Sequence, residues 1–136
     1  MIRKIGPSLD PVVVVEDHPL HGRFLRRALE ERLDGRPVEL IPDGTAAARR
    51  LRDPAQPVPA LLVLDLELPG RSGHELLGDR ANDPRLAPVP AAIVTSSAAP
   101  GDHERSLALG ASAHLSKPED PAGFADLADR LAELLG

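Results

Sequence analysis

Two short runs of exclusively apolar residues, 12–15 and 60–64, constrain the fold of this 136-residue chain most strongly. A strand that is apolar at every position has both faces buried, which is typical of parallel sheets covered by helices on both sides. Both runs are far shorter than the roughly 20 residues that a membrane span requires. We therefore expect two central strands of an α/β fold, and no interaction with a membrane.

The rest of the chain alternates between strand-like and helix-like segments. A capping box formed by Ser72 and Glu75 predicts the start of the third helix. Further strands are expected at 38–41, 91–94 and 111–115, and helices at 19–33, 45–52, 73–81, 102–109 and 124–134. Five strands alternating with five helices indicate an α/β fold with a parallel sheet and right-handed crossovers. We expect one domain over residues 11–136 after a lead-in at 1–10, with no output domain.

Composition excludes several functions. The chain has no cysteine, so disulfides, thiolate nucleophiles and zinc-thiolate sites are ruled out. A formal net charge of −5 and only two aromatic residues, both phenylalanine, argue against a partner that is a nucleic acid. The N-terminal residues lack the apolar stretch of a signal peptide, so the expected location is cytoplasmic.

Polar residues follow four of the expected strands. Glu16 and Asp17 follow the first strand, Asp65 the third, Thr95 the fourth and Lys117 the fifth. Ligands of open α/β sheets bind at these C-terminal strand ends. Carboxylates without cysteine or histidine partners favour Mg²⁺, an aspartate can act as a nucleophile, and a hydroxyl and an ammonium can bind phosphoryl oxygens. The sequence therefore predicts a phosphoryl acceptor site.

Each residue also has an interpretation without a function. Asp17 could cap the following helix, Thr95 is a common residue type in strands, and a lone lysine such as Lys117 is usually solvated. The placement of all of them at successive strand ends is much harder to explain in this way.

Four stretches of the chain resemble the receiver domain of two-component response regulators. They are VVVVEDHP (12–19), LLVLDLELPGRSG (61–73), AAIVTSS (91–97) and GASAHLSKP (110–118). The spacing agrees, with 48 residues from Asp17 to Asp65, 30 from Asp65 to Thr95 and 22 from Thr95 to Lys117. The resemblance covers nearly the whole chain and implies a doubly wound, flavodoxin-like (βα)5 fold with strand order 2-1-3-4-5.

The resemblance also implies a role for each site residue. Asp65 would take a phosphoryl group from a phosphohistidine of a sensor histidine kinase, Thr95 would move toward that group, and Lys117 would pair with it. The Mg²⁺ ligands would be Glu16, Asp17, Asp65 and the backbone carbonyl of Glu67. The Lys117–Pro118 bond is a candidate cis peptide. Such a protein is not an enzyme toward other substrates, since it catalyses only its own phosphorylation and dephosphorylation.

In the family that the chain resembles, three positions affect the lifetime of the phosphoryl group or the conformational response to it. Glu67 and Ser97 occupy positions that tune phosphoryl lifetime in the family, and the carboxylate of Glu67 suggests slow self-dephosphorylation. His114 stands where receivers usually carry a tyrosine or phenylalanine that acts as a switch. It could titrate near neutral pH, although a partly buried, hydrogen-bonded histidine without a pH role is the favoured interpretation.

The remaining basic residues predict little. His18 and His21 share a helix face without a third metal ligand at a recognisable spacing. His74 and His103 are expected on the surface. The arginines of the second helix, Arg49, Arg50 and Arg52, are expected to form a solvated basic face.

The residues of these motifs are similar to those of the stand-alone regulators paired with bacterial phytochromes. The expected partners are a sensor histidine kinase and a second copy of the chain, bound through a surface at 102–135 that includes His103, Arg105 and Arg130. Three alternatives stay open: a phosphorelay shuttle to a histidine phosphotransfer protein, a phosphorylation-independent adaptor, and an aspartate-nucleophile phosphatase that uses Asp65 and Glu67.

Overall fold

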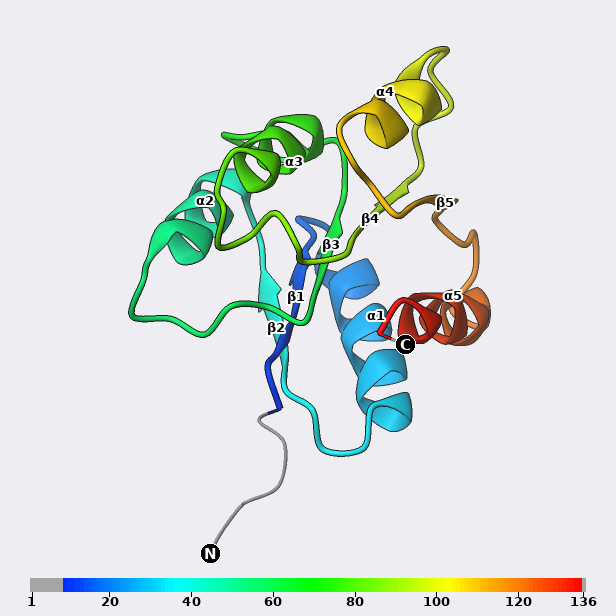
Figure 1. Ribbon diagram of the computed structural model, residues 1–136. Coiled ribbons are helices and arrows are strands. Elements are labelled where there is room, and N and C mark those ends of the chain that lie inside the picture. Colours follow the sequence, from blue (N-terminus) through cyan, green and yellow to red (C-terminus); the bar gives the residue numbers. More distant parts are fainter. Residues whose placement is uncertain (1–8, 136) are drawn as a thin grey trace, which may run out of the picture.

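The computed structural model describes residues 9–135, which contain a five-stranded, all-parallel sheet (Figure 1). The strands lie side by side in the order β2-β1-β3-β4-β5. They are β1 (Val12–Val15), β2 (Val38–Ile41), β3 (Leu61–Leu64), β4 (Ala91–Thr95) and β5 (Ala113–Ser116). Because the order reverses between β1 and β3, the C-terminal ends of these two strands border the crevice where ligands bind in such sheets.

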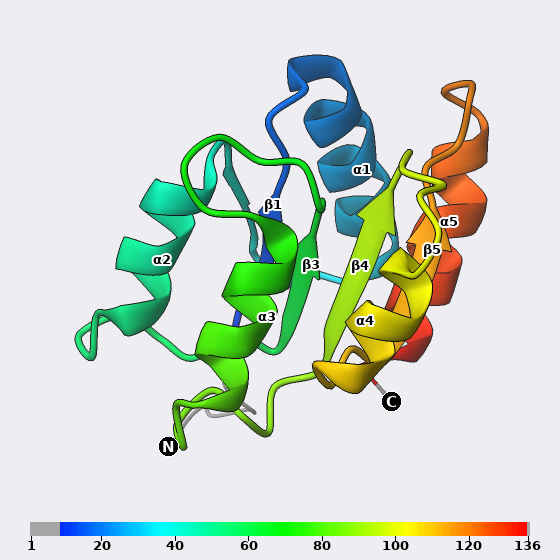
Figure 2. The same ribbon diagram turned by 90° about the horizontal axis from the view of Figure 1, so that it is seen from above.

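Helices cover both faces of the sheet. They are α1 (Pro19–Arg32), α2 (Gly44–Arg52), α3 (Gly73–Ala81), α4 (Asp102–Ala108) and α5 (Gly123–Glu133). Figure 2 shows α1 and α5 packed together on one face, and α2, α3 and α4 on the other. The predicted doubly wound (βα)5 fold and its strand order 2-1-3-4-5 are confirmed.

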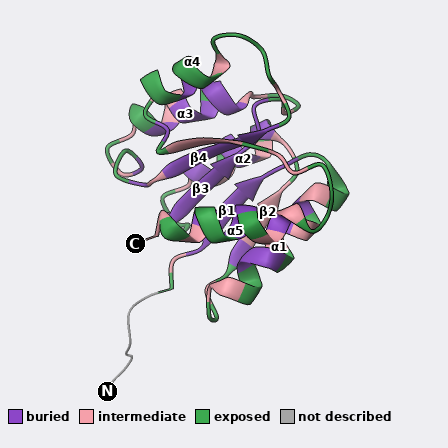
Figure 3. Ribbon diagram, turned by 90° about the vertical axis from the view of Figure 1, so that its right-hand side faces the viewer, coloured by how far each residue is buried: buried purple, intermediate pink, exposed green. Residues whose placement is uncertain are grey.

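The alternation of side chains along β1 divides the core into two clusters. Val12 and Val14 pack with residues of α1 and α5, whereas Val13 and Val15 pack with residues of α2 and α3. All four valines are buried, as are the four residues of β3 (Figure 3). Burying one such side chain stabilises the fold by about 1.5–3 kcal/mol. The two apolar runs are therefore the centre of the molecule, as predicted.

Two details differ from the sequence expectations. The fifth strand begins at Ala113 rather than at 111, because the backbone N–H of Ala111 still donates to the last turn of α4, at Ser106 O, over 3.0 Å. Arg50 is not solvated, since its guanidinium binds both carboxylate oxygens of Glu39 on β2 at 2.8 and 3.0 Å. Its side chain is only 10% exposed.

The expected lead-in at 1–10 lies outside the described residues except for its last two positions. Within residues 9–135, none of the helices combines the length and the apolar character that crossing a membrane requires.

Arg80 of α3 connects this helix to the segment before β4 by hydrogen bonds. Among residues 9–135 its guanidinium has no carboxylate partner. Its guanidinium donates to the carbonyls of Val89 at 2.7 Å, Ala87 at 3.2 Å and Gly110 at 3.5 Å. The residue is 8% exposed, and burial lowers the pKa of its guanidinium. A single buried cation thus holds the loop between α3 and β4 and the loop between α4 and β5, both at the N-terminal end of the sheet.

We expect the substitution Arg80→Met to lower the free energy of unfolding by about 2–3 kcal/mol, because the buried carbonyls lose a charged donor. Urea unfolding followed by circular dichroism measures this change. Arg49→Met, on the exposed face of α2, is the matched control and should stay within about 0.5 kcal/mol of wild type. Equal stabilities of the two variants would show that Arg80 does not fasten these loops.

Candidate functional site

Three carboxylates meet where β1 and β3 end. The parallel register pairs Val15 with Leu64, so the next residues, Glu16 and Asp65, lie side by side. Both are buried, at 7% and 6% exposure, whereas Asp17 is exposed. One carboxylate oxygen of each residue lies within 4.8 Å of the other two. The three acidic residues that the sequence predicts for this edge are therefore brought together.

Lys117 joins two of these carboxylates from the end of β5. Its Nζ lies 2.8 Å from Glu16 Oε1 and 2.8 Å from Asp65 Oδ2, and all three side chains are 7% exposed. Burial alone would lower the pKa of Lys117, but the hydrogen bonds to Asp65 and Glu16 outweigh burial and raise it. Burial raises the pKa of Glu16, and the bonds from Lys117 and from the His18 N–H oppose this rise in part.

Thr95, the last residue of β4, supplies the hydroxyl of the site. It is 2% exposed, and its carbonyl accepts the backbone N–H of Lys117 at 3.0 Å. Its Oγ1 accepts the backbone N–H of Ser97 at 3.1 Å. A surface pocket of about 510 Å³ is lined by Thr95, Ser96, Ser97 and Lys117. A neighbouring pocket of about 430 Å³, which shares Ser96 and Lys117, contains Asp65.

The loop from β3 to α3 is fixed close behind Asp65. The backbone N–H of Glu67 donates to Asp65 Oδ1 at 3.3 Å, and the side chain of Glu67 is exposed. Gly73 begins α3 so close to the Asp65 carbonyl that a Cβ at this position would collide with it. A glycine is therefore required for the helix to start here.

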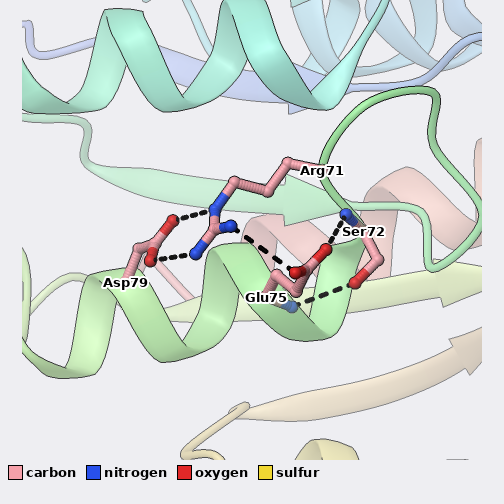
Figure 4. Close-up of polar contacts among 4 residues, drawn as sticks. All are labelled: Arg71, Ser72, Glu75 and Asp79. Carbon is pink, nitrogen blue, oxygen red and sulfur yellow. Dashed lines mark hydrogen bonds and ion pairs between the residues drawn. The ribbon is translucent and has the colours of Figure 1, made fainter.

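The same loop is held at its far end by polar contacts that Figure 4 shows. The predicted capping box is present, since Ser72 Oγ accepts the Glu75 N–H at 3.1 Å and Glu75 Oε1 accepts the Ser72 N–H at 3.0 Å. The bond from the Ser72 N–H holds the pKa of Glu75 below its usual value. Arg71 binds both oxygens of Asp79 (Figure 4). The carboxylate of Asp65 thus sits on a fixed backbone.

Two possibilities raised for this edge are not realised in the structure, the alternative role of Asp17 as a helix cap and the candidate cis peptide. Asp17 does not cap α1, because the cap is His18, whose Nδ1 accepts the N–H of His21 at 3.4 Å. The Lys117–Pro118 bond is not cis, since residues 9–135 contain no cis peptide bond. The lysine reaches the carboxylates from a trans backbone that is tied to Thr95.

Ser106 is the centre of a polar cluster that the sequence analysis missed. It is 0% exposed, and its Oγ lies 2.9 Å from His74 Nε2, 2.8 Å from His114 Nδ1 and 2.9 Å from the Asp102 carbonyl. His114 is partly buried and hydrogen-bonded, as favoured, and its ring stacks on that of His103 at 5.0 Å between centroids. His74 is not on the surface as expected, since it is only 7% exposed.

The acidic residues fit a hard divalent cation. Among residues 9–135, Glu16, Asp17 and Asp65 are the only group of three acidic, histidine or cysteine residues close enough to share a metal ion. The donors are carboxylate oxygens, which Mg²⁺ prefers over nitrogen and sulfur ligands. Lys117 engages one oxygen each of Glu16 and Asp65, so the exposed Asp17 is the carboxylate most open to an incoming cation.

Comparison with known proteins identifies the class. The response regulator receiver domain family matches residues 12–129, and the chain belongs to this family. It is thus a receiver domain of a two-component system, a class in which an aspartyl phosphate and Mg²⁺ are typical.

Particular relatives include the probable methanogenesis regulatory protein FilR2 of Methanothrix harundinacea, which is 32% identical over 92% of this chain and 82% of FilR2. Response regulator Rcp1 of Synechocystis is 28% identical over 78% of this chain and 75% of Rcp1. The crystal structure of the Mn²⁺-bound form of Rcp1 gives a TM-score of 0.83 at 24% identity, covering 91% of this chain and 92% of that one. The phosphorylated cyanobacterial phytochrome response regulator RcpA gives 0.84 at 24% identity, covering 94% of each chain. Both structures have the same fold as this chain.

We expect the buried histidine His74 to make the free energy of unfolding depend on pH. Burial and the charge of Arg105 lower its pKa below the usual 6.5. Between the usual pKa of 6.5 and the lowered pKa of the folded state, the unfolded chain binds a proton at His74 that the folded chain excludes. The free energy of unfolding should therefore fall as the pH drops from about 6.5. We expect a smaller fall for His74→Gln, measured by urea unfolding at several pH values, whereas the control Arg49→Met, at an exposed residue of α2, should keep the wild-type slope. Equal slopes for His74→Gln and wild type would contradict this assignment.

Proposed function

We propose that this receiver domain accepts a phosphoryl group on Asp65 from the phosphohistidine of a sensor histidine kinase, and passes the signal on by protein contact. The observation that carries the proposal is the ammonium of Lys117 at 2.8 Å from both Glu16 and Asp65, at the sheet edge where Thr95 ends the neighbouring strand. These groups supply a nucleophile, a cation and a hydroxyl for the transferred group.

The transfer is a displacement at phosphorus. A carboxylate oxygen of Asp65 forms the new bond, the P–N bond of the phosphohistidine breaks, and the imidazole leaves with its electron pair and is protonated. Lys117 then pairs with a phosphoryl oxygen in place of the carboxylate oxygen, and the Thr95 hydroxyl donates to another. Hydrolysis reverses the modification when water attacks the phosphorus and releases phosphate. In this proposal the chain catalyses only these two reactions on itself.

Glu16, Asp17, Asp65 and the backbone carbonyl of Glu67 are the groups that would hold Mg²⁺. When bound, the ion supplies positive charge for the phosphoryl oxygens and for the attacking carboxylate. The mixture of buried and exposed carboxylates supports this role, because the exposed Asp17 is open to solvent while Glu16 and Asp65 are held in place.

The proposal extends to the partners. A bacterial phytochrome is the kinase to test first, because RcpA is described as a phytochrome response regulator. A homodimer would use the surface at 102–135, which includes His103, Arg105 and Arg130. Two observations support a homodimer through this surface. The strand β5 lies at the edge of the sheet, and the apolar side chain of Leu107 is 48% exposed.

We expect incubation with acetyl phosphate and Mg²⁺ to add one phosphoryl group to the wild-type chain, measured by intact mass. The adduct should disappear in Asp65→Asn and when EDTA removes the metal ion, because the nucleophile or the neutralising charge is then missing. Asp126→Asn, at an exposed aspartate of α5, is the matched control and should be modified like wild type. A wild-type chain that takes no phosphoryl group, from acetyl phosphate or from a kinase, would favour the adaptor.

Glu67 should lengthen the life of the phosphoryl group. Its side chain lines the same pocket as Asp65. Its negative charge repels an attacking hydroxide, and its carboxylate binds water away from the position for attack. We expect Glu67→Asn to lose the phosphoryl group several-fold faster than wild type, measured as decay of the mass adduct after acetyl phosphate is removed. Glu133→Gln, exposed on α5, should decay at the wild-type rate. Equal decay of Glu67→Asn and wild type would refute this role.

Two alternatives use the same side chains and need separate assays. A phosphorelay shuttle would pass the phosphoryl group from Asp65 to a histidine phosphotransfer protein, which labelled phosphate can follow. An aspartate-nucleophile phosphatase would turn over a small phosphoester many times, whereas the proposed acceptor would not.

A further inference from the structure

Both phenylalanines of the chain and two of its histidines form one row of ring contacts. The rings of His18 and His21 stack at 3.7 Å between centroids, with 10° between their planes. The ring of His21 lies 5.8 Å from that of Phe124, which lies 5.7 Å from that of Phe24. The chain contains no tyrosine or tryptophan, so both of its phenyl rings belong to this row. We call His18, His21, Phe124 and Phe24 the ring row.

The ring row leads from the core to the surface. Phe124 is 3% exposed and belongs to the core on the α1–α5 face of the sheet. His21 is partly buried, and His18 is exposed. The Nδ1 of His21 is buried without a hydrogen-bond partner among residues 9–135, so contacts with the neighbouring rings position this imidazole. His18 is thus an exposed ring with a rigid support behind one of its faces.

The exposed end of the ring row lies at the candidate site. His18 lines the same pocket of about 430 Å³ as Asp65 and Lys117. Its backbone N–H donates to Glu16 Oε2 at 3.0 Å, which ties the residue to the buried carboxylates. His21 covers one face of the His18 ring, and no other ring in the described part of the chain lies against it. The other face is therefore open to a planar group that enters the pocket.

Capping alone does not explain a histidine at this position. His18 is the N-cap of α1, but its Nδ1 accepts the His21 N–H only at 3.4 Å, beyond the usual range for such a bond. Asparagine, aspartate and serine are the preferred residues at N-caps. What a histidine adds to a cap is an aromatic ring, and here the ring is supported from behind.

We propose that His18 is a stacking platform for the imidazole of the phosphohistidine donor. This inference rests on the proposed function, because it concerns the group that leaves when Asp65 is phosphorylated. In an in-line displacement the entering and leaving atoms lie on opposite sides of phosphorus. An oxygen of Asp65 forms the P–O bond, the P–N bond breaks, and the imidazole departs with its electron pair and is protonated by water. Because Asp65 is buried, the leaving ring lies at the solvent end of the pocket, where His18 is exposed.

The platform makes His18 a residue that determines donor specificity. An aromatic pair prefers an offset stack or an edge-to-face contact, and an imidazole on the open face of His18 would extend the ring row by one member. A donor without a ring gains nothing from this contact. The transfer of the phosphoryl group itself remains with Asp65, so removing the ring should change the choice of donor and not the acceptor chemistry.

Three small phosphoryl donors test the platform. Phosphoimidazole has a P–N bond and a ring, phosphoramidate has a P–N bond without a ring, and acetyl phosphate has neither. Each is incubated with the full chain and Mg²⁺, and intact mass gives the rate constant of phosphorylation per unit of donor concentration. The quantity compared between variants is the ratio of the rate constant for phosphoimidazole to that for phosphoramidate. A change in folding or in metal affinity affects both donors alike and cancels in this ratio.

Two substitutions at one position separate the ring from the cap. His18→Asn keeps a side-chain oxygen that caps α1 but removes the ring, so the ratio should fall by about threefold to tenfold, the range of one aromatic stack. His18→Phe keeps a ring but cannot cap, so its ratio should stay within about twofold of wild type. A wild-type ratio in His18→Asn, or an equal fall in His18→Phe, would overturn the platform.

Acetyl phosphate separates this inference from the proposed function. His18→Asn should react with acetyl phosphate at the wild-type rate, because the acetate that leaves has no ring. The matched control Glu30→Gln, at an exposed residue near the other end of α1, should keep the wild-type rates with all three donors. Equal losses with all donors in His18→Asn would overturn the platform and leave the acceptor role of Asp65 intact. A wild-type chain that takes no phosphoryl group from any of the three donors overturns both.

Discussion

The buried ammonium of Lys117 holds together the strand ends on which the rest of the site depends. Two carboxylates with 7% exposed side chains stand beside it, and charges in such an environment persist only when they are paired and hydrogen-bonded. The pairing draws the end of β5 toward the ends of β1 and β3, across the intervening β4. It also leaves an excess of negative charge, because one ammonium faces two carboxylates with the exposed Asp17 beside them. A site with this balance of charges favours a further cation. Under the proposed function, a phosphoryl group would add negative charge and strengthen this preference.

The segments on the two sides of Asp65 differ in how firmly they are held. On the α3 side, Gly73 packs against the Asp65 carbonyl, and a capping box closes the first turn of the helix. On the α4 side, the N-cap residue is Gly101, which provides no side-chain hydrogen bond, and the helix buries only one residue, the polar Ser106. Asp65 is therefore fixed on one side and bordered on the other by a segment with few apolar contacts. Under the proposed function such an asymmetry would suit a switch, since Asp65 would stay in place while one neighbouring element changes position.

The sequence was sufficient for the features that depend on pattern. The buried strands follow from their apolar runs, and Asp65 and Lys117 follow from strand ends that a parallel sheet brings to one edge. It was insufficient where the outcome depends on how helices sit on the sheet. Ser106 lies in a short helix with no strong apolar pattern, and only the folded structure brings it against His74 from α3 and His114 from β5. Nothing in the local sequence distinguishes His74 from the exposed His103.

The histidine at position 114 differs from a phenylalanine in the kind of contact that holds its ring. The chain has only two aromatic side chains, Phe24 and Phe124, and they lie together near the α1–α5 face, with ring centroids 5.7 Å apart. A phenylalanine ring at position 114 would be held by apolar contact, which is non-directional. An imidazole bonded to a buried hydroxyl is held by a contact that weakens steeply with distance and angle. The contact between α4 and β5 at His114 is therefore directional, unlike the apolar packing of the two phenylalanines.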